Sequence, residues 1–156
     1  IIYRKTAILF EASAKIGGVL SNINDSSVED LGAYGKNFGI AYQLRNDYLD
    51  YFGDDNQTGK NIAEDLSEGK STLPLIHSYI NSNDNDKNTI KNIFDKKLVS
   101  DTDELREIFY RNESDKYTLK EIDKYSYNAI KALDSLDIDS SKALIDLTKY
   151  CSTRTR

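Results

Sequence analysis

The stretch QLRNDYLD, residues 43–50, decides how the rest of this chain is interpreted. On a helix, the i,i+3 and i,i+4 spacings of Gln43, Asp47 and Asp50 put three oxygen-bearing side chains on one face. Asn46 lies four residues before Asp50, at the edge of the same face. Oxygen donors without a nearby His or Cys are typical ligands of hard cations such as Mg²⁺. The stretch therefore predicts a metal site on a helix, with a solvated acidic face as the alternative.

The composition is typical of a globular, helical chain. The chain has 156 residues and a net charge of -5, which argues against a nucleic-acid-binding surface. One proline and plentiful Leu, Ile, Ala, Lys and Glu favour helices. Cys151 is the single cysteine, so no intrachain disulfide is possible. The sequence contains no run of 18 apolar residues and no signal peptide, and we expect no membrane span and a cytoplasmic location.

Apolar residues recur at helical spacing along most of the chain. They predict helices over residues 1–19, 28–52, 73–81, 89–98, 102–111, 117–136 and 140–151. The pattern Ser26-x-x-Glu29 is typical of a capping box at the start of the second helix, and the apolar-free run 81–88 is expected to be an exposed loop. Glycines at 32, 35 and 39 favour the close approach of another helix. We expect one all-α domain over residues 1–156, an antiparallel helix bundle.

Lysines flank the oxygen-rich face on both sides. Lys5-Thr6 precedes it, and Lys60 and Lys70 each follow a glycine in the segment after the second helix. A lysine is a compact charge with rotatable donors, which suits a diphosphate whose oxygens also bind Mg²⁺. Each lysine alone is more often a solvated surface charge, so the prediction depends on their combination with the carboxylates.

Taken together, the motifs resemble the second half of a trans-type polyprenyl diphosphate synthase of the geranylgeranyl or farnesyl kind. The resemblance is specific over residues 1 to about 80, because several motifs follow one another in the family's order. They are KTAxLF at 5–10, GxAYQLxNDxLD at 39–50, GK at 59–60, ED at 64–65 and EGKSTLP at 68–74. The resemblance implies the isoprenoid synthase type of all-α bundle, of which this chain is expected to be the C-terminal part of a larger catalytic domain.

The resemblance also implies an activity and its residues. The family joins an allylic diphosphate to isopentenyl diphosphate with Mg²⁺, making linear isoprenoid diphosphates. Asp47, Asp50 and Asn46 would bind the metal, with Asp65 as a secondary candidate. The residues implied to bind substrate are Lys5, Thr6, Gln43, Lys60 and Lys70. Among these, Lys5 and Lys60 are implied to be catalytic together with Asp47, and a homodimer is expected.

Two departures from the family pattern leave alternatives open. Asn46 stands where the family usually has an aspartate, and the family's first aspartate-rich motif is not in this sequence, so we expect the isolated chain to be inactive. A class I terpene cyclase has a related metal motif, and a non-catalytic regulatory subunit of a prenyl diphosphate synthase is the second alternative. A third is a Ca²⁺ loop starting at Asp54, whose spacing is similar to that of an EF-hand.

Overall fold

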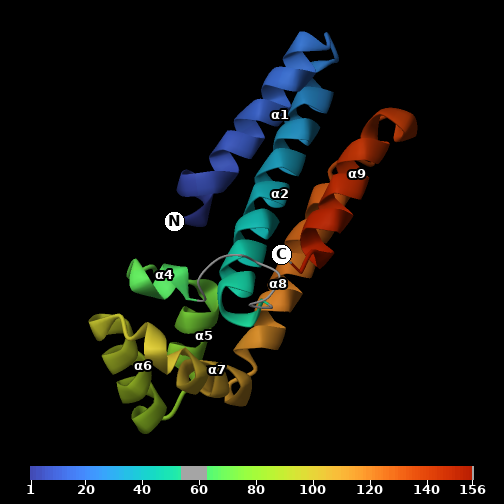
Figure 1. The fold of residues 1–156 in the computed structure, drawn as a ribbon. Helices are drawn as coiled ribbons and strands as arrows, with labels where there is room; N and C mark the ends of the chain where they lie inside the picture. The colour runs from blue at the N-terminus through green and yellow to red at the C-terminus, as the bar shows by residue number, and fades with distance from the viewer. Residues whose placement is uncertain (54–62, 156) are drawn as a thin grey trace. The chain divides into compact units, whose positions relative to one another are not determined.

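The computed structural model describes residues 1–53 and 63–155, and its regular elements within these ranges are all helical (Figure 1). A π-helical turn, η1, and a 3₁₀ turn, η2, accompany the α-helices, and the described part contains no strand. The elements are η1 Tyr3–Ala7, α1 Ile8–Leu20, α2 Asp25–Phe52, α4 Glu64–Ser67, α5 Leu73–Asn81, α6 Asp84–Lys96, η2 Val99–Asp101, α7 Thr102–Arg111, α8 Ser114–Lys131 and α9 Ile138–Thr153. The predicted all-α class is confirmed.

The first of two compact units consists of Ile1–Arg45 and Glu121–Arg154. Its core lies between α2, the end of α8 and α9, where Tyr34 and Phe38 are buried with residues of both later helices. The Tyr34 hydroxyl donates to the Leu144 carbonyl at 3.1 Å and so ties α9 to α2. An apolar side of α2 therefore forms part of this core.

The second unit consists chiefly of Asn46–Lys120. It contains the end of α2 and the shorter helices α4 to α7, with the buried rings of Tyr51 and Phe109 packed edge to face at 5.2 Å between centroids. Further members of its core are Ala63, Leu66, Leu75, Ile90, Ile93, Leu105 and Ile108. In the residues that the structure describes, no helix is both long and apolar enough to cross a bilayer.

Several predicted helix boundaries are wrong. The capping residue of α2 is Asn24, whose side chain accepts the Ser27 amide at 2.9 Å, so Ser26 does not open a capping box. Residues 84–88, predicted to be loop, form the first turns of α6, because Asn83 caps this helix by accepting the Asp86 amide at 2.9 Å. Helix α8 ends at Lys131, five residues early, at a turn that contains Asp134 and Ser135.

Candidate functional site

The glycine face of α2 lies directly against η1 and the start of α1. A Cβ atom at Gly35 would lie 2.4 Å from the Phe10 carbonyl oxygen, and one at Gly39 would lie 2.6 Å from the Ala7 Cα. No side chain fits at either distance, so both positions require glycine for packing. The predicted close approach of another helix is confirmed, and it brings the N-terminal turn onto α2.

This approach joins two predicted substrate-binding residues. Thr6 lies in η1, and its hydroxyl donates to Gln43 Oε1 at 3.0 Å. The bond fixes the orientation of the Gln43 amide on α2. Lys5, the preceding residue, has an exposed side chain. Single π-helical turns are frequent at functional sites, because the extra residue changes the direction of neighbouring side chains.

The predicted metal ligands follow Gln43 on the same helix. Because α2 is unbroken from Asp25 to Phe52, helical geometry puts Asp47 and Asp50 on the face that was predicted from the spacing. Asp47 is only 6% exposed, whereas Asn46 and Asp50 are half-buried. A carboxylate that is buried to this degree needs a compensating charge or hydrogen bonds.

Asp50 caps α4. Its two carboxylate oxygens accept the amide N–H groups of Glu64 at 3.0 Å and Asp65 at 3.1 Å, and its carbonyl accepts the Ala63 amide at 3.0 Å. Burial raises the pKa of Asp50 to about 6, and the negative charge of Asp65 adds to the rise, while the two backbone hydrogen bonds partly offset it. The residue predicted as a metal ligand is therefore also the anchor for the chain that returns to α2.

Lys70 reaches this cluster through the C-terminal turn of α4. Gly69 adopts a left-handed conformation (φ 74°). The Lys70 amide donates to the Asp65 carbonyl at 2.8 Å, and the Gly69 amide donates to the Leu66 carbonyl at 3.0 Å, the pattern of a Schellman motif. Lys70 Nζ then pairs with the Asp65 carboxylate at 2.9 Å and with Glu68, and these hydrogen bonds raise its pKa. Glycine is therefore favoured at position 69 because the turn that ends α4 requires a left-handed backbone there.

The structure assembles the predicted residues in two groups, one in each unit. Thr6 meets Gln43 in the first, and Asp50, Asp65 and Lys70 are linked in the second. Lys60 lies outside the described residues, as does most of the alternative Ca²⁺ loop. Among the residues described, no group of three or more His, Cys, Asp or Glu side chains is arranged to hold a metal ion.

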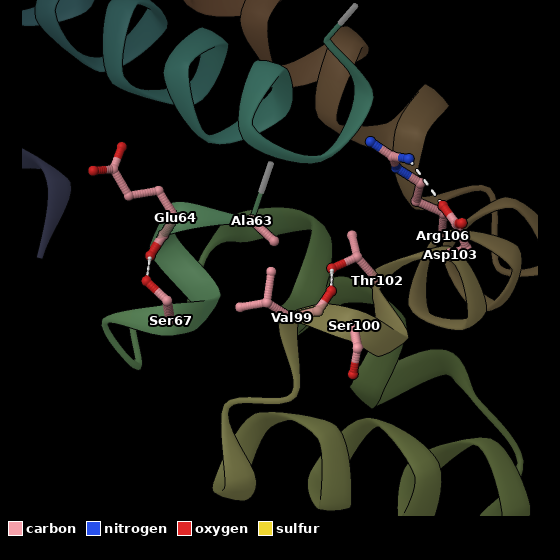
Figure 2. Close-up of a pocket in the computed structure, with 8 residues that line it drawn as sticks. All are labelled: Ala63, Glu64, Ser67, Val99, Ser100, Thr102, Asp103 and Arg106. Carbon is pink, nitrogen blue, oxygen red and sulfur yellow. Dashed lines mark hydrogen bonds and ion pairs between the residues drawn. The ribbon is translucent and has the colours of Figure 1, made fainter. Parts of the chain in front are cut away.

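A pocket of about 550 Å³ lies between α4 and the start of α7 (Figure 2). Ala63 and Glu64 form one wall, and Thr102 and Arg106 belong to the other. Arg106 pairs with Asp103 at 3.0 Å, and its Nε donates to the Tyr51 carbonyl at the end of α2. Arg106 thus satisfies a terminal helix carbonyl, so this side of the pocket stabilises the helix that carries the predicted ligands.

Arg45 has a structural role that the sequence did not predict. It is 7% exposed, and its Nε donates to the Arg154 carbonyl at 2.9 Å, with a second bond from a terminal nitrogen. Arg154 in turn places its guanidinium 4.9 Å from the ring centroid of Tyr42. Arg45 therefore caps the C-terminal end of α9 from inside the motif at 43–50. The two residues are 109 positions apart, so no local pattern could have indicated the contact.

Comparison with known proteins gives consistent matches. The sequence model of the family described as polyprenyl synthetase matches residues 1–111. The octaprenyl diphosphate synthase of Escherichia coli is 49% identical over 78 residues, which are 50% of this chain and 24% of that protein. The geranylgeranyl diphosphate synthase of Saccharolobus solfataricus is 33% identical over 140 residues, 89% of this chain and 42% of that protein.

A solved structure with similar helices is the polyprenyl synthase of Caulobacter crescentus complexed with calcium and isoprenyl diphosphate. It superposes with a TM-score of 0.91 at 31% identity, covering 99% of this chain and 48% of that protein. The chain spans less than half the length of each of these three relatives.

Proposed function

Because the chain belongs to the polyprenyl synthetase family, as the match over residues 1–111 shows, we propose that the complete protein is a polyprenyl diphosphate synthase. This prenyltransferase condenses an allylic diphosphate with isopentenyl diphosphate and makes linear isoprenoid diphosphates. Residues 1–156 are proposed to be part of one catalytic domain. The proposal includes a homodimer and a cytoplasmic location, where both charged substrates are dissolved.

The observation that carries the proposal is the linked set Asp50, Asp65 and Lys70. Asp50 holds the first turn of α4 by two backbone hydrogen bonds, and Asp65 of that turn pairs with Lys70 at 2.9 Å. A carboxylate for a metal and a cation for a phosphate are therefore held by one short network. Such fixed charges stabilise a leaving diphosphate without reorganisation during the reaction.

The donor set fits Mg²⁺. The candidate ligands are the carboxylate oxygens of Asp47 and Asp50 and the amide oxygen of Asn46. Mg²⁺ prefers oxygen ligands of this kind. The raised pKa of Asp50 reflects burial and the neighbouring charge of Asp65, and a cation near the two carboxylates would relieve that repulsion. When bound, Mg²⁺ supplies positive charge to the diphosphate oxygens as the carbon–oxygen bond breaks. We propose these three residues as its ligands.

In this proposal, lysine side chains and the polar side chains of Thr6 and Gln43 bind the substrate diphosphate. Lys5, Thr6 and Gln43 bind the allylic diphosphate, and the 3.0 Å Thr6–Gln43 bond orients their polar atoms. Lys60 and Lys70 neutralise the charge that develops on the leaving group. Lys70 pairs with the Asp65 and Glu68 carboxylates in the structure. In the proposal it pairs with phosphate oxygens once the substrate is bound, so its charge has a partner in both states.

The names of the relatives favour a synthase over the alternatives. The matching proteins are named octaprenyl and geranylgeranyl diphosphate synthases, so neither a terpene cyclase nor a non-catalytic regulatory subunit is favoured.

The test is the incorporation of labelled isopentenyl diphosphate by the purified complete protein with Mg²⁺, followed by sizing of the products. Linear products of defined length are expected. A single cyclic hydrocarbon would indicate a cyclase, and product formation only with a second polypeptide would indicate a subunit. Asp47→Ala should reduce turnover far more than Asn46→Ala, because a carboxylate ligand carries charge and an amide does not. Equal and mild effects would mean that the metal ligands are misassigned.

A further inference from the structure

The ring of Tyr42, the residue before Gln43, has neighbours from two distant parts of the chain. Phe10 of α1 packs against it, with ring centroids 5.5 Å apart. Arg154, the residue that follows α9, places its guanidinium carbon Cζ over the Tyr42 ring at 4.9 Å from the centroid. This distance is typical of a cation–π contact. One side chain of α2 therefore links the start of α1 to the C-terminal end of α9.

The backbone of Arg154 is held independently of its side chain. Its carbonyl accepts two hydrogen bonds from the Arg45 guanidinium, of which the bond from Nε is 2.9 Å long. Its amide donates to the Tyr150 carbonyl at 3.0 Å and so continues the hydrogen bonding of α9. Because the backbone is anchored at both groups, only the side chain of Arg154 has to be ordered for the guanidinium to lie over Tyr42.

Phe10 connects the Tyr42 ring to η1. A Cβ atom at Gly35 would lie 2.4 Å from the Phe10 carbonyl oxygen, and one at Gly39 would lie 2.9 Å from the ring carbon Cδ2 of Phe10. Both the backbone and the ring of Phe10 are therefore in close contact with α2. Thr6 lies four residues before Phe10, in η1. A displacement of Phe10 away from α2 would move the turn that carries Thr6.

The hydrogen bond between Thr6 and Gln43 lies next to this aromatic contact, because Gln43 directly follows Tyr42 in the sequence. Without the guanidinium, the half-buried Tyr42 ring would lose a neighbour and gain freedom to turn away from Phe10. We propose that Arg154 is a positioning residue for the substrate-binding pair Thr6 and Gln43. Its guanidinium holds the Tyr42 ring against Phe10, and this contact keeps η1 in register with α2.

The role of Arg154 rests on the proposed function in one respect, the binding of the allylic diphosphate by Thr6 and Gln43. Its contacts lie within the first compact unit. Arg154 acts through Tyr42 and is not itself expected to touch the substrate. Its loss should therefore weaken the binding of substrate and transition state alike, which raises KM and leaves kcat unchanged.

The test is steady-state kinetics of the complete protein with Mg²⁺, farnesyl diphosphate and labelled isopentenyl diphosphate. Arg154→Met removes the charge but keeps the backbone carbonyl that Arg45 binds, so the end of α9 stays anchored. The KM for farnesyl diphosphate should rise about 3- to 10-fold, the range of a partly buried cation–π contact. Arg154→Lys keeps a cation at this place and should show a smaller rise.

A second comparison shows whether Arg154 acts through Tyr42. Tyr42→Leu should itself raise the KM for farnesyl diphosphate, and in this background Arg154→Met should cause no further rise, because both changes break the same contact. The matched control is Lys149→Met, which removes an exposed cation near the end of the same helix. This control should leave the KM at the wild-type value.

Three results would overturn the positioning role. They are an unchanged KM in Arg154→Met, the same KM in Arg154→Lys as in Arg154→Met, and a full further rise caused by Arg154→Met in the Tyr42→Leu background. A wild-type protein that does not turn over farnesyl diphosphate would count against the proposed function instead. A double-mutant cycle of unfolding free energies would then still decide on the contact, because fully additive effects of Arg154→Met and Tyr42→Leu would exclude it.

Discussion

Gly39 of α2 approaches Ala7 of η1 so closely that a Cβ atom at position 39 would lie 2.6 Å from the Ala7 Cα. This contact positions the π-helical turn, and one residue before Ala7 the Thr6 hydroxyl meets Gln43. A packing requirement on one face of α2 therefore determines the position of a predicted substrate-binding residue.

Substitution of Gly39 by alanine should separate η1 from α2. The added methyl group meets backbone atoms that cannot turn aside, so we expect Gly39→Ala to lower the free energy of unfolding by about 1–3 kcal/mol. The Thr6–Gln43 bond should be lost with it, and the KM for the allylic diphosphate should rise. Urea denaturation and steady-state kinetics of the complete protein measure the two effects.

The control for this prediction is Gly17→Ala in α1. A Cβ atom at Gly17 would meet nothing within 4 Å, so the substitution should stabilise the helix by up to about 1 kcal/mol. Equal stability changes for the two alanine variants would contradict the close packing at Gly39.

Removal of the Asp50 side chain should release the first turn of α4. Asp50→Ala deletes both acceptors of the Glu64 and Asp65 amides, a cap whose contribution is typically about 1 kcal/mol. Hydrogen exchange of these two amides should therefore become roughly fivefold faster or more. The Ala63 amide, bonded to the Asp50 backbone carbonyl, should keep its protection.

Glu64→Gln is the matched control, because it changes an exposed side chain and leaves both amides bonded to Asp50. If Asp50→Ala left the exchange of Glu64 and Asp65 unaltered, the capping role would be wrong.

His77 should titrate below its ordinary range. It is the single histidine of the chain, its ring stacks on Tyr117 with centroids 4.0 Å apart, and Nδ1 lies 2.9 Å from the Ser114 hydroxyl. Burial lowers its pKa from 6.5. An NMR titration should follow one isolated imidazole resonance with a midpoint below 6.5, and Tyr117→Ala should move that midpoint upward by exposing the ring.

The same shift makes stability depend on pH. As the pH falls through 6.5 toward the lower pKa of the folded protein, the unfolded chain takes up a proton that folded His77 does not. The free energy of unfolding should therefore decrease over this window and level off below it. His77→Gln should remove this contribution. A midpoint of 6.5 in the folded protein would abolish this dependence and one above 6.5 would reverse its sign, and either result would exclude the burial argument.

Loss of Arg45 should free the end of α9. Arg45→Met removes two hydrogen bonds to the Arg154 carbonyl from a buried guanidinium, so unfolding should require about 1.5–3 kcal/mol less free energy. Arg45→Lys keeps the charge but not the fork of donors, so its free energy of unfolding should lie between those of the wild type and Arg45→Met. Denaturation that is unchanged in Arg45→Met would show that the α9 cap contributes nothing.

Local sequence determined the helices and the face that carries the candidate site. Helices α5 and α7 have the predicted bounds, because apolar spacing and the proline in the first turn of α5 are local properties. The start of α6 was open to the same reasoning, since Asn83 caps an amide only three residues ahead. The polarity of its first turn obscured that pattern. The glycines of α2 likewise predicted a close neighbour, though not which one.

The tertiary structure alone decided which polar groups meet. Asp50 bonds to amides 14 and 15 residues away, and Arg45 reaches a carbonyl 109 residues away. Helical periodicity assigns a residue to a face because backbone geometry repeats every 3.6 residues. It carries no information on the partner, which depends on how the chain returns and on which buried polar atoms must then satisfy one another.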